Sequence, residues 1–279
     1  MEKWNLVIDV ELCENCNNCV LSTKDEHVGN EFEGYSAPAA EEGAELISIT
    51  RNVRGQAPVV DTAYLVSMCN HCDNPPCKKV GGDAVQKRDD GIVIMDPVKA
   101  KGREDIARSC PYGAIVWNGQ RQLPQSWYFD AHLLDQGWSK PRCVQSCPTG
   151  ALEAIRVTDS DMRKRVDEEN LQVLKPELKT MPRVYYRNLY RYTECFIGGT
   201  VTTSVEGVQE CVQGAQVTLF QRDRQLGETE TDAFGEFKLD KLPPGSGAYT
   251  VLIAHAEHGK SSVETKLDES LYLGEIKLM

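Results

Sequence analysis

Closely spaced cysteines constrain this chain more than any other feature of its sequence. They form two triplets, Cys13, Cys16 and Cys19 with the spacing C-x-x-C-x-x-C, and Cys69, Cys72 and Cys77 with the spacing C-x-x-C-x-x-x-x-C. Such spacing lets three thiolates of one tight loop reach three irons of a [4Fe–4S] cubane, and in two-cluster ferredoxins the fourth thiolate comes from a Cys-Pro pair of the other half. The chain has two such pairs, Cys110-Pro111 and Cys147-Pro148. The sequence therefore predicts two [4Fe–4S] clusters with four cysteine ligands each.

Cysteines in such numbers can also bind zinc or form disulfides. Structural zinc favours two C-x-x-C pairs or a Cys/His set, whereas these cysteines come as triplets, so zinc is disfavoured. His71 lies inside the second triplet, and we expect it either to support the site or to lie at the surface rather than to be a ligand. His27 and His132 carry no functional signal in the sequence. A disulfide scaffold is typical of short secreted chains, and no secretory signal precedes the strand-like run from Trp4 to Asp9.

The distribution of cysteines also predicts the domain organisation of an α+β protein. Nine of the 11 cysteines lie between Cys13 and Cys147, in a loop-rich segment with short apolar runs. We assign residues 1–158 to a pseudo-twofold, dicluster-ferredoxin-like domain. Residues 159–197 are expected to form a linker that opens with a surface helix from Asp159 that ends before Pro176, followed by an extended stretch. Residues 198–279 alternate polar and apolar side chains between Gly, Pro and Asp turns, which predicts a small all-β sandwich of six or seven strands.

Charge and hydropathy exclude some classes of partner. The formal net charge of −11 argues against nucleic-acid binding, which requires a basic face. The basic and aromatic stretch from Arg183 to Tyr192 is better explained as an extended segment that packs between domains or against a larger protein. No apolar run approaches the roughly 20 residues that span a bilayer. We therefore expect a soluble, cytoplasmic protein without direct membrane insertion.

Several further motifs carry a resemblance to a known family. The segments Asn17-Asn18-Cys19, Asp25-Glu26-His27, Gly91-Ile92-Val93, Ala131–Asp135 and Pro182–Tyr186 accompany the cysteine motifs over nearly the whole chain. With them, the chain resembles the iron–sulfur subunits of the DMSO-reductase family of molybdenum enzymes. Together with the added β-sandwich, which resembles transthyretin-like or carboxypeptidase-regulatory modules, they narrow the resemblance to the small subunits of transhydroxylases and hydroxylases that act on polyhydroxybenzenes.

This resemblance implies which Cys-Pro pair completes which cluster. In that family the first cysteine motif pairs with the fourth, and the second with the third. Carried over to this chain, the first cluster takes Cys13, Cys16, Cys19 and Cys147, and the second takes Cys69, Cys72, Cys77 and Cys110. Both ligand sets are complete.

A typical member of this family has four cysteine motifs with sixteen ligands for four clusters. This chain departs from that pattern at the other two cluster positions. The third site lacks cysteines at Thr23, Trp127 and Asp130, so that Cys143 alone remains. The fourth lacks one at Gly81 and has none from Ala100 to Ile106. We therefore expect Cys143 to be a buried or reactive free thiol, and Cys195 and Cys211 to be small apolar residues or an incidental thiol pair. The two retained clusters would be the ends of a chain whose middle is missing, so electron transfer between them should be slow.

The family resemblance implies a non-catalytic subunit of a heterodimeric molybdopterin oxidoreductase or transhydroxylase acting on phenolic substrates. Substrate chemistry and the molybdopterin would belong to a large partner subunit, because no pterin-binding signature or acid–base pair is evident here. A scaffold whose clusters are mainly structural is the first alternative, and a free-standing dicluster ferredoxin is the second. The sequence does not identify the phenolic substrate, the reaction direction or the electron acceptor.

Overall fold

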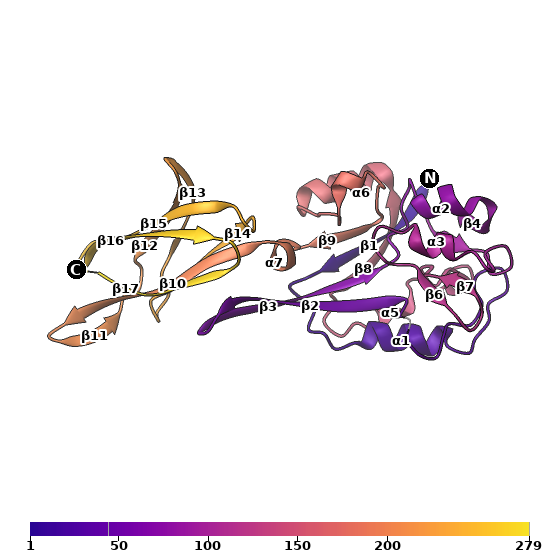
Figure 1. Cartoon of the computed structure of the whole chain (residues 1–279), viewed down its shortest axis with the longest axis horizontal. Coiled ribbons are helices and arrows are strands. Elements are labelled where there is room, and N and C mark those ends of the chain that lie inside the picture. Colours follow the sequence, from indigo (N-terminus) through magenta and orange to yellow (C-terminus); the bar gives the residue numbers. More distant parts are fainter. Residues whose placement is uncertain (44, 279) are drawn as a thin grey trace. The chain divides into compact units, whose positions relative to one another are not determined.

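A computed structural model describes residues 1–43 and 45–278 of the chain. These residues divide into two compact units. The first comprises residues 1–51 and 64–189, and the second comprises residues 52–63 and 190–279. Figure 1 labels most of the elements of each unit. The two units are therefore interleaved in sequence, because the tip of one hairpin belongs to the second unit.

The first unit is organised around a three-stranded sheet. Strand β1 (Glu2–Asp9) pairs antiparallel with β8 (Leu152–Thr158) and parallel with β9 (Val184–Arg187). The second half of β1, from Asn5 to Asp9, is buried, and Leu6 and Ile8 are completely inaccessible to solvent. Each buried side chain of this kind contributes roughly 1.5–3 kcal/mol through the hydrophobic effect. The two ends of the segment that holds nine cysteines are thus joined in one sheet.

Short elements joined by loops make up the rest of the first unit. The helices are α1 (Asn18–His27), α2 (Pro76–Gly81), α3 (Glu104–Arg108), α4 (Ala131–Leu134), α5 (Arg142–Gln145) and α6 (Asp159–Glu168), with 3-10 turns at Gly82–Ala84 and Pro176–Leu178. Two small antiparallel ribbons join β4 (Val85–Lys87) to β5 (Val93–Met95) and β6 (Val116–Asn118) to β7 (Leu123–Gln125). A longer hairpin joins β2 (Ile47–Gln56) to β3 (Val59–Met68). The predicted loop-rich character of this region is confirmed.

The predicted surface helix is shorter than the sequence suggested. Helix α6 begins at Asp159, where the Thr158 side chain accepts a hydrogen bond from the backbone N–H of Asp161. It ends at Glu168 instead of continuing to the residues before Pro176. Asn170 has a φ of 51°, and this left-handed conformation breaks the helical path. Leu171 nevertheless packs in the same apolar cluster as Met162, which explains why its spacing had resembled a longer helix.

The second unit contains two four-stranded sheets. One joins β11 (Val208–Cys211), β10 (Cys195–Val205), β14 (Glu236–Leu242) and β17 (Leu271–Lys277), and the other has the order β13 (Arg224–Glu230), β12 (Gln216–Gln221), β15 (Gly247–His255), β16 (Gly259–Leu267). Alternate side chains of both sheets, such as Ile197, Val217 and Ile253, meet in one apolar core. A short helix, α7 (Tyr190–Thr193), precedes β10. The period-two pattern therefore predicted strands correctly, and the described residues contain eight of them after residue 194.

A cluster of charges fixes the hairpin tip within the second unit. Arg54 is only 5% exposed and bonds Asp61 at 2.6 Å and Asp240 at 2.8 Å. Lys238 and Arg191 also donate to Asp61. Burial raises the pKa of the Asp61 carboxyl, but hydrogen bonds from these three cations outweigh it and hold that pKa below its ordinary value. Residues 52–63 are thus part of this unit because their charges pair with side chains of the second unit.

The remaining cysteines do not pair. Cys195 is buried in the core of the second unit, whereas Cys211 is exposed at the end of β11, and both are free. The alternative of an incidental thiol pair is therefore wrong, since the two side chains lie on different strands with different neighbours. Cys211 also does not act as a buried apolar residue.

The basic stretch is neutralised by carboxylates within the described structure. Arg183 is 3% exposed and contacts Asp73 and Asp159, and Arg187 pairs with Asp9. This stretch supplies strand β9 to the sheet of the first unit. Its arginines thus stabilise the fold instead of presenting a free basic face.

Candidate metal centres

The first group of thiols comes from two ends of the cysteine-rich segment. Cys13, Cys16 and Cys19 lie in the loop after β1 and in the first turn of α1, and Cys147 follows α5. The loop turns sharply because Asn15 and Asn17 adopt left-handed conformations, with φ of 57° and 61°. Asparagine tolerates this conformation better than most residues. The local sequence Asn-x-Asn thus lets three cysteines share one short loop.

These four thiols lie close enough for a negative charge on one to disfavour a negative charge on another. Burial raises the pKa of the Cys19 thiol to about 12, and Cys13, Cys147 and Cys16 contribute to this rise by mutual repulsion. Burial likewise raises the pKa of Cys13, with Cys147 and Cys16 contributing. Four thiolates gathered in this way are unfavourable unless positive charge lies among them. The donor set therefore fits the iron of a cluster, which binds cysteine as thiolate.

The second group has the same composition in a more buried setting. Cys69 follows β3, Cys72 lies in the next loop, Cys77 lies in α2 and Cys110 follows α3. Burial raises the pKa of the Cys77 thiol to about 11, with repulsion from Cys110 and Cys72 contributing. Burial also raises the pKa of Cys69, with Cys77, Cys110 and Cys72 again contributing. These four thiols thus also form one mutually repelling group that a cationic cluster would relieve.

The two groups differ in their access to solvent. Cys69, Cys72 and Cys77 are 7–8% exposed, whereas Cys16 of the first group is exposed and Cys13 and Cys147 are half-buried. A cluster held by the first group would therefore reach the protein surface. One held by the second would be shielded over most of its ligands.

His71 braces the second group without acting as a free base. The backbone N–H of Val93 donates to Nδ1 of His71 at 3.0 Å, which leaves the ring proton on Nε2. Nδ1 also lies 4.0 Å from Sγ of Cys69, and the ring is fully buried against Trp127 and Phe129. Burial lowers the pKa of His71 to about 3, so the ring is neutral. The alternative of a surface role is thus wrong, and the contacts of the ring fit the supporting role.

A site for a single metal ion has a different geometry from these two groups of four thiols. Within residues 1–43 and 45–278, no three or more His, Cys, Asp or Glu side chains gather closely enough to hold one metal ion. In a cubane, each of the four irons takes one thiolate, so the ligands surround a larger body than a single ion.

A packed polar core occupies the position where the family pattern has a third cluster. Trp127, Asp130 and Cys143 are completely buried, and Thr23 is 2% exposed. Nε1 of Trp127 and Nε2 of His27 lie 3.2 and 3.1 Å from Oδ1 of Asp130. The backbone N–H of Arg142 donates to Oδ2 at 2.9 Å. Cys143 is a fully buried free thiol, as predicted, and burial raises its pKa well above the ordinary value.

An apolar core occupies the position where the family pattern has a fourth cluster. A Cβ added to Gly81 would lie 2.6 Å from Cγ2 of Val85 and 3.0 Å from Cδ1 of Ile106. Both of these side chains are completely buried in a cluster that also contains Ala100 and Cys77. There is consequently no room for a cysteine side chain at position 81.

The sequence alone did not reveal the polar network around Asp130. Nε2 of His132 lies 2.9 Å from Glu26, and Glu26 also pairs with Arg142 at 2.5 Å. These partners are separated by more than 100 residues in the chain. No local pattern in the sequence predicts such pairing, and neither His27 nor His132 had carried a functional signal in the sequence.

Comparisons with known proteins identify the class of protein to which the chain is similar. Residues 60–156 match the family model described as a 4Fe-4S dicluster domain. The chain is 42% identical to the pyrogallol hydroxytransferase small subunit of Pelobacter acidigallici, with both chains covered completely. It is 30% identical to one subunit of the tetrathionate reductase of Salmonella typhimurium, over 67% of this chain and 73% of that one.

A putative dimethyl sulfoxide reductase iron-sulfur subunit of Halobacterium salinarum is 29% identical over 67% of this chain and 80% of its own. The predicted resemblance is thereby confirmed over the whole chain. The chain belongs to the family of iron–sulfur small subunits of the DMSO-reductase type of molybdoenzyme, within which it is similar to the pyrogallol hydroxytransferase small subunit.

Proposed function

We propose that the chain is the small subunit of a heterodimeric molybdoenzyme that acts on polyhydroxybenzenes, and that it holds two [4Fe–4S] clusters. Cys13, Cys16, Cys19 and Cys147 would bind the first, and Cys69, Cys72, Cys77 and Cys110 the second. The observation that carries this proposal is the gathering of eight thiols into two groups of four. When bound, the clusters supply one-electron transfer.

The chain's own residues hold the clusters and control access to them. The exposed Cys16 leaves one edge of the first group open, which suits exchange of electrons with a partner protein. The buried second group is braced by His71 and by Lys87, whose Nζ donates to the His71 carbonyl at 2.8 Å. Lys87 also pairs with Asp73 at 3.0 Å. Substrate chemistry and molybdopterin would belong to the large partner subunit, because the relatives of this chain are small subunits and iron-sulfur subunits of larger enzymes.

The test is purification of the complex from its source under anaerobic conditions. We expect a molybdenum-containing large subunit to co-purify, and about 8 iron per small subunit, as two four-iron cubanes require. Isolation of the chain without such a partner would contradict the proposed role. An iron content near 12 or 16 would show that the filled positions at Trp127 and Gly81 do hold clusters.

A structural role for the clusters is the second candidate. The observation that favours it is the closed packing at the third and fourth positions, where Trp127 and Ile106 are completely buried. Cluster ligation would tie the loop at Cys13 to Cys147, across most of the first unit, as metal sites do in other small domains. Redox titration followed by EPR distinguishes the two roles. Clusters that never change oxidation state during turnover would support the structural role.

The domain assignment is also part of this proposal. We propose a ferredoxin-like domain at residues 1–158, a helix and extended connection at 159–197, and a transthyretin-like sandwich at 198–279. The two sheets around one apolar core support the last of these. We further propose that the enzyme works in anaerobic phenol metabolism in the cytoplasm, because eight cysteine ligands must stay reduced. No helix among the described residues is long and apolar enough to cross a membrane.

A further inference from the structure

One nitrogen of a buried histidine has no hydrogen-bond partner. His27 is 1% exposed, and its Nε2 lies 3.1 Å from the Asp130 carboxylate. A carboxylate only accepts, so Nε2 carries a proton. The other nitrogen, Nδ1, is one of three buried side-chain polar atoms in the described structure without a partner. Leaving a polar atom of this kind unpaired is costly, so such atoms usually have a partner such as an ordered water.

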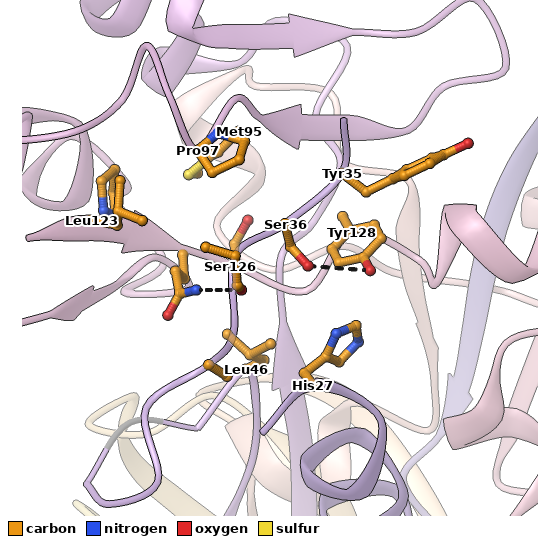
Figure 2. Close-up of a pocket in the computed structure, with 13 residues that line it drawn as sticks. His27, Tyr35, Ser36, Leu46, Met95, Pro97, Leu123, Ser126 and Tyr128 are labelled. Carbon is orange, nitrogen blue, oxygen red and sulfur yellow. Dashed lines mark hydrogen bonds between the residues drawn. The ribbon is translucent and has the colours of Figure 1, made fainter. Parts of the chain in front are cut away.

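A small cavity lies against His27. The space open to the centre of a water molecule is about 20 Å³, and roughly 10–15 Å³ is enough for one water. The wall contains the side chains of Ser36, Tyr128 and Ser126 as well as apolar groups such as Leu46 (Figure 2). A second space beside His27 measures only about 10 Å³. The larger space is thus both roomy and polar enough for a single water.

Hydrogen-bond directions leave an acceptor free on the cavity wall. Nε2 of His132 donates to the Glu26 carboxylate, so Nδ1 of a neutral His132 accepts from the Tyr128 hydroxyl at 2.8 Å. Because Tyr128 donates there, its oxygen accepts from the Ser36 hydroxyl at 3.3 Å. The Ser36 oxygen then retains a lone pair for another donor. Figure 2 shows the bonded Ser36 and Tyr128 hydroxyls beside the same pocket as the His27 ring.

We propose that this cavity binds one internal water molecule, which donates one hydrogen bond to Nδ1 of His27 and one to the Ser36 hydroxyl. The water joins two buried networks, His27 with Asp130 and Ser36–Tyr128–His132–Glu26. It completes the polar core that stands at the third cluster position of the family. The loop that carries Ser36 is thereby tied to helix α1, which carries part of the first thiol group.

High-resolution crystal structures of the cluster-loaded protein test this proposal. In the wild type we expect one fully occupied water about 2.7–3.2 Å from Nδ1 of His27. In Ser36→Ala, we expect the water to be lost or its occupancy to fall by at least half. Tyr35→Phe is the matched control, because Tyr35 lines the same cavity but its hydroxyl bonds Asp135 at 2.7 Å instead. The water should remain in this variant.

Three results would overturn the inference. They are a dry cavity in the wild type, a partner of Nδ1 found only in the smaller space, and an undiminished water in Ser36→Ala. If Ser36→Ala does not yield folded protein, the wild-type density at Nδ1 decides the question alone.

Discussion

Replacing Cys147 tests the ligand assignment most directly. Cys147 interacts electrostatically with Cys13 and Cys19 of the first group. Cys147→Ala therefore removes one of four ligands from the first cluster and none from the second. Since Cys147 is half-buried, solvent would have access to the position that its thiolate leaves. We expect the iron content to fall from about 8 to between about 4 and 7 per chain, depending on whether the damaged cluster is lost or keeps three irons.

Cys143→Ala is the control, because Cys143 is the other thiol near the first group. It lies on α5, four positions before Cys147, and interacts with Cys19. Yet Cys143 is completely buried, and its strongest electrostatic interaction is with the Asp130 carboxylate. Removing one buried sulfur leaves a small void, so we expect a modest loss of stability and an unchanged content of about 8 iron.

Chemical iron determination and EPR of the reduced protein provide the assay. Cys147→Ala should alter the signal of one cluster and leave the other intact, and Cys143→Ala should leave both as in the wild type. If Cys143→Ala lost iron while Cys147→Ala kept it, the fourth ligand would be Cys143, and the pairing implied by the family would be wrong for this chain.

Three further predictions concern stability. Gly81→Cys should cost about 1–3 kcal/mol, because its Cβ meets buried side chains, whereas Gly119→Cys has open space and should be close to neutral in the same thermal unfolding experiment. Asp130→Asn should destabilise the first unit by about 1–3 kcal/mol, because the NH₂ group of the new side chain would face at least one of the three donors that now bond the carboxylate, and that donor would lose its acceptor. An unchanged midpoint of urea unfolding would contradict this. The lowered pKa of Asp61 means that its ion pairs stabilise the fold above the unfolded pKa of about 3.9. That contribution is lost as the pH falls through the folded pKa, so Asp61→Asn should be less stable at pH 7 and flatten the acid limb of the stability curve; a limb as steep as in the wild type would refute it.

Local patterns in the sequence were reliable where the chemistry is local. The cysteine triplets predict cluster sites from spacing alone, and the left-handed Asn15 and Asn17 account for the tight turn at the first of them. Alternating side chains predicted strands in the second unit for the same reason, since side-chain direction in a strand has a period of two. The prediction was wrong for the end of α6, where one left-handed residue, Asn170, interrupted an otherwise helical pattern.

Contacts between distant residues were decided only by tertiary structure. The hairpin tip at 52–63 joins the second unit because Arg54 pairs with Asp240, 186 residues away. The core around Asp130 draws its partners from residues up to 103 positions away, and each alone looked unremarkable in sequence.

The sequence by itself thus predicted two four-cysteine sites and determined which family the chain resembles, because cluster ligation depends on residue type and short spacing. Only the tertiary structure decided what fills the two lost sites, a hydrogen-bonded core at Trp127 and Asp130 and an apolar core against Gly81. The physical reason is that burial and hydrogen bonding depend on which side chains meet in space, and spacing along the chain does not encode those encounters.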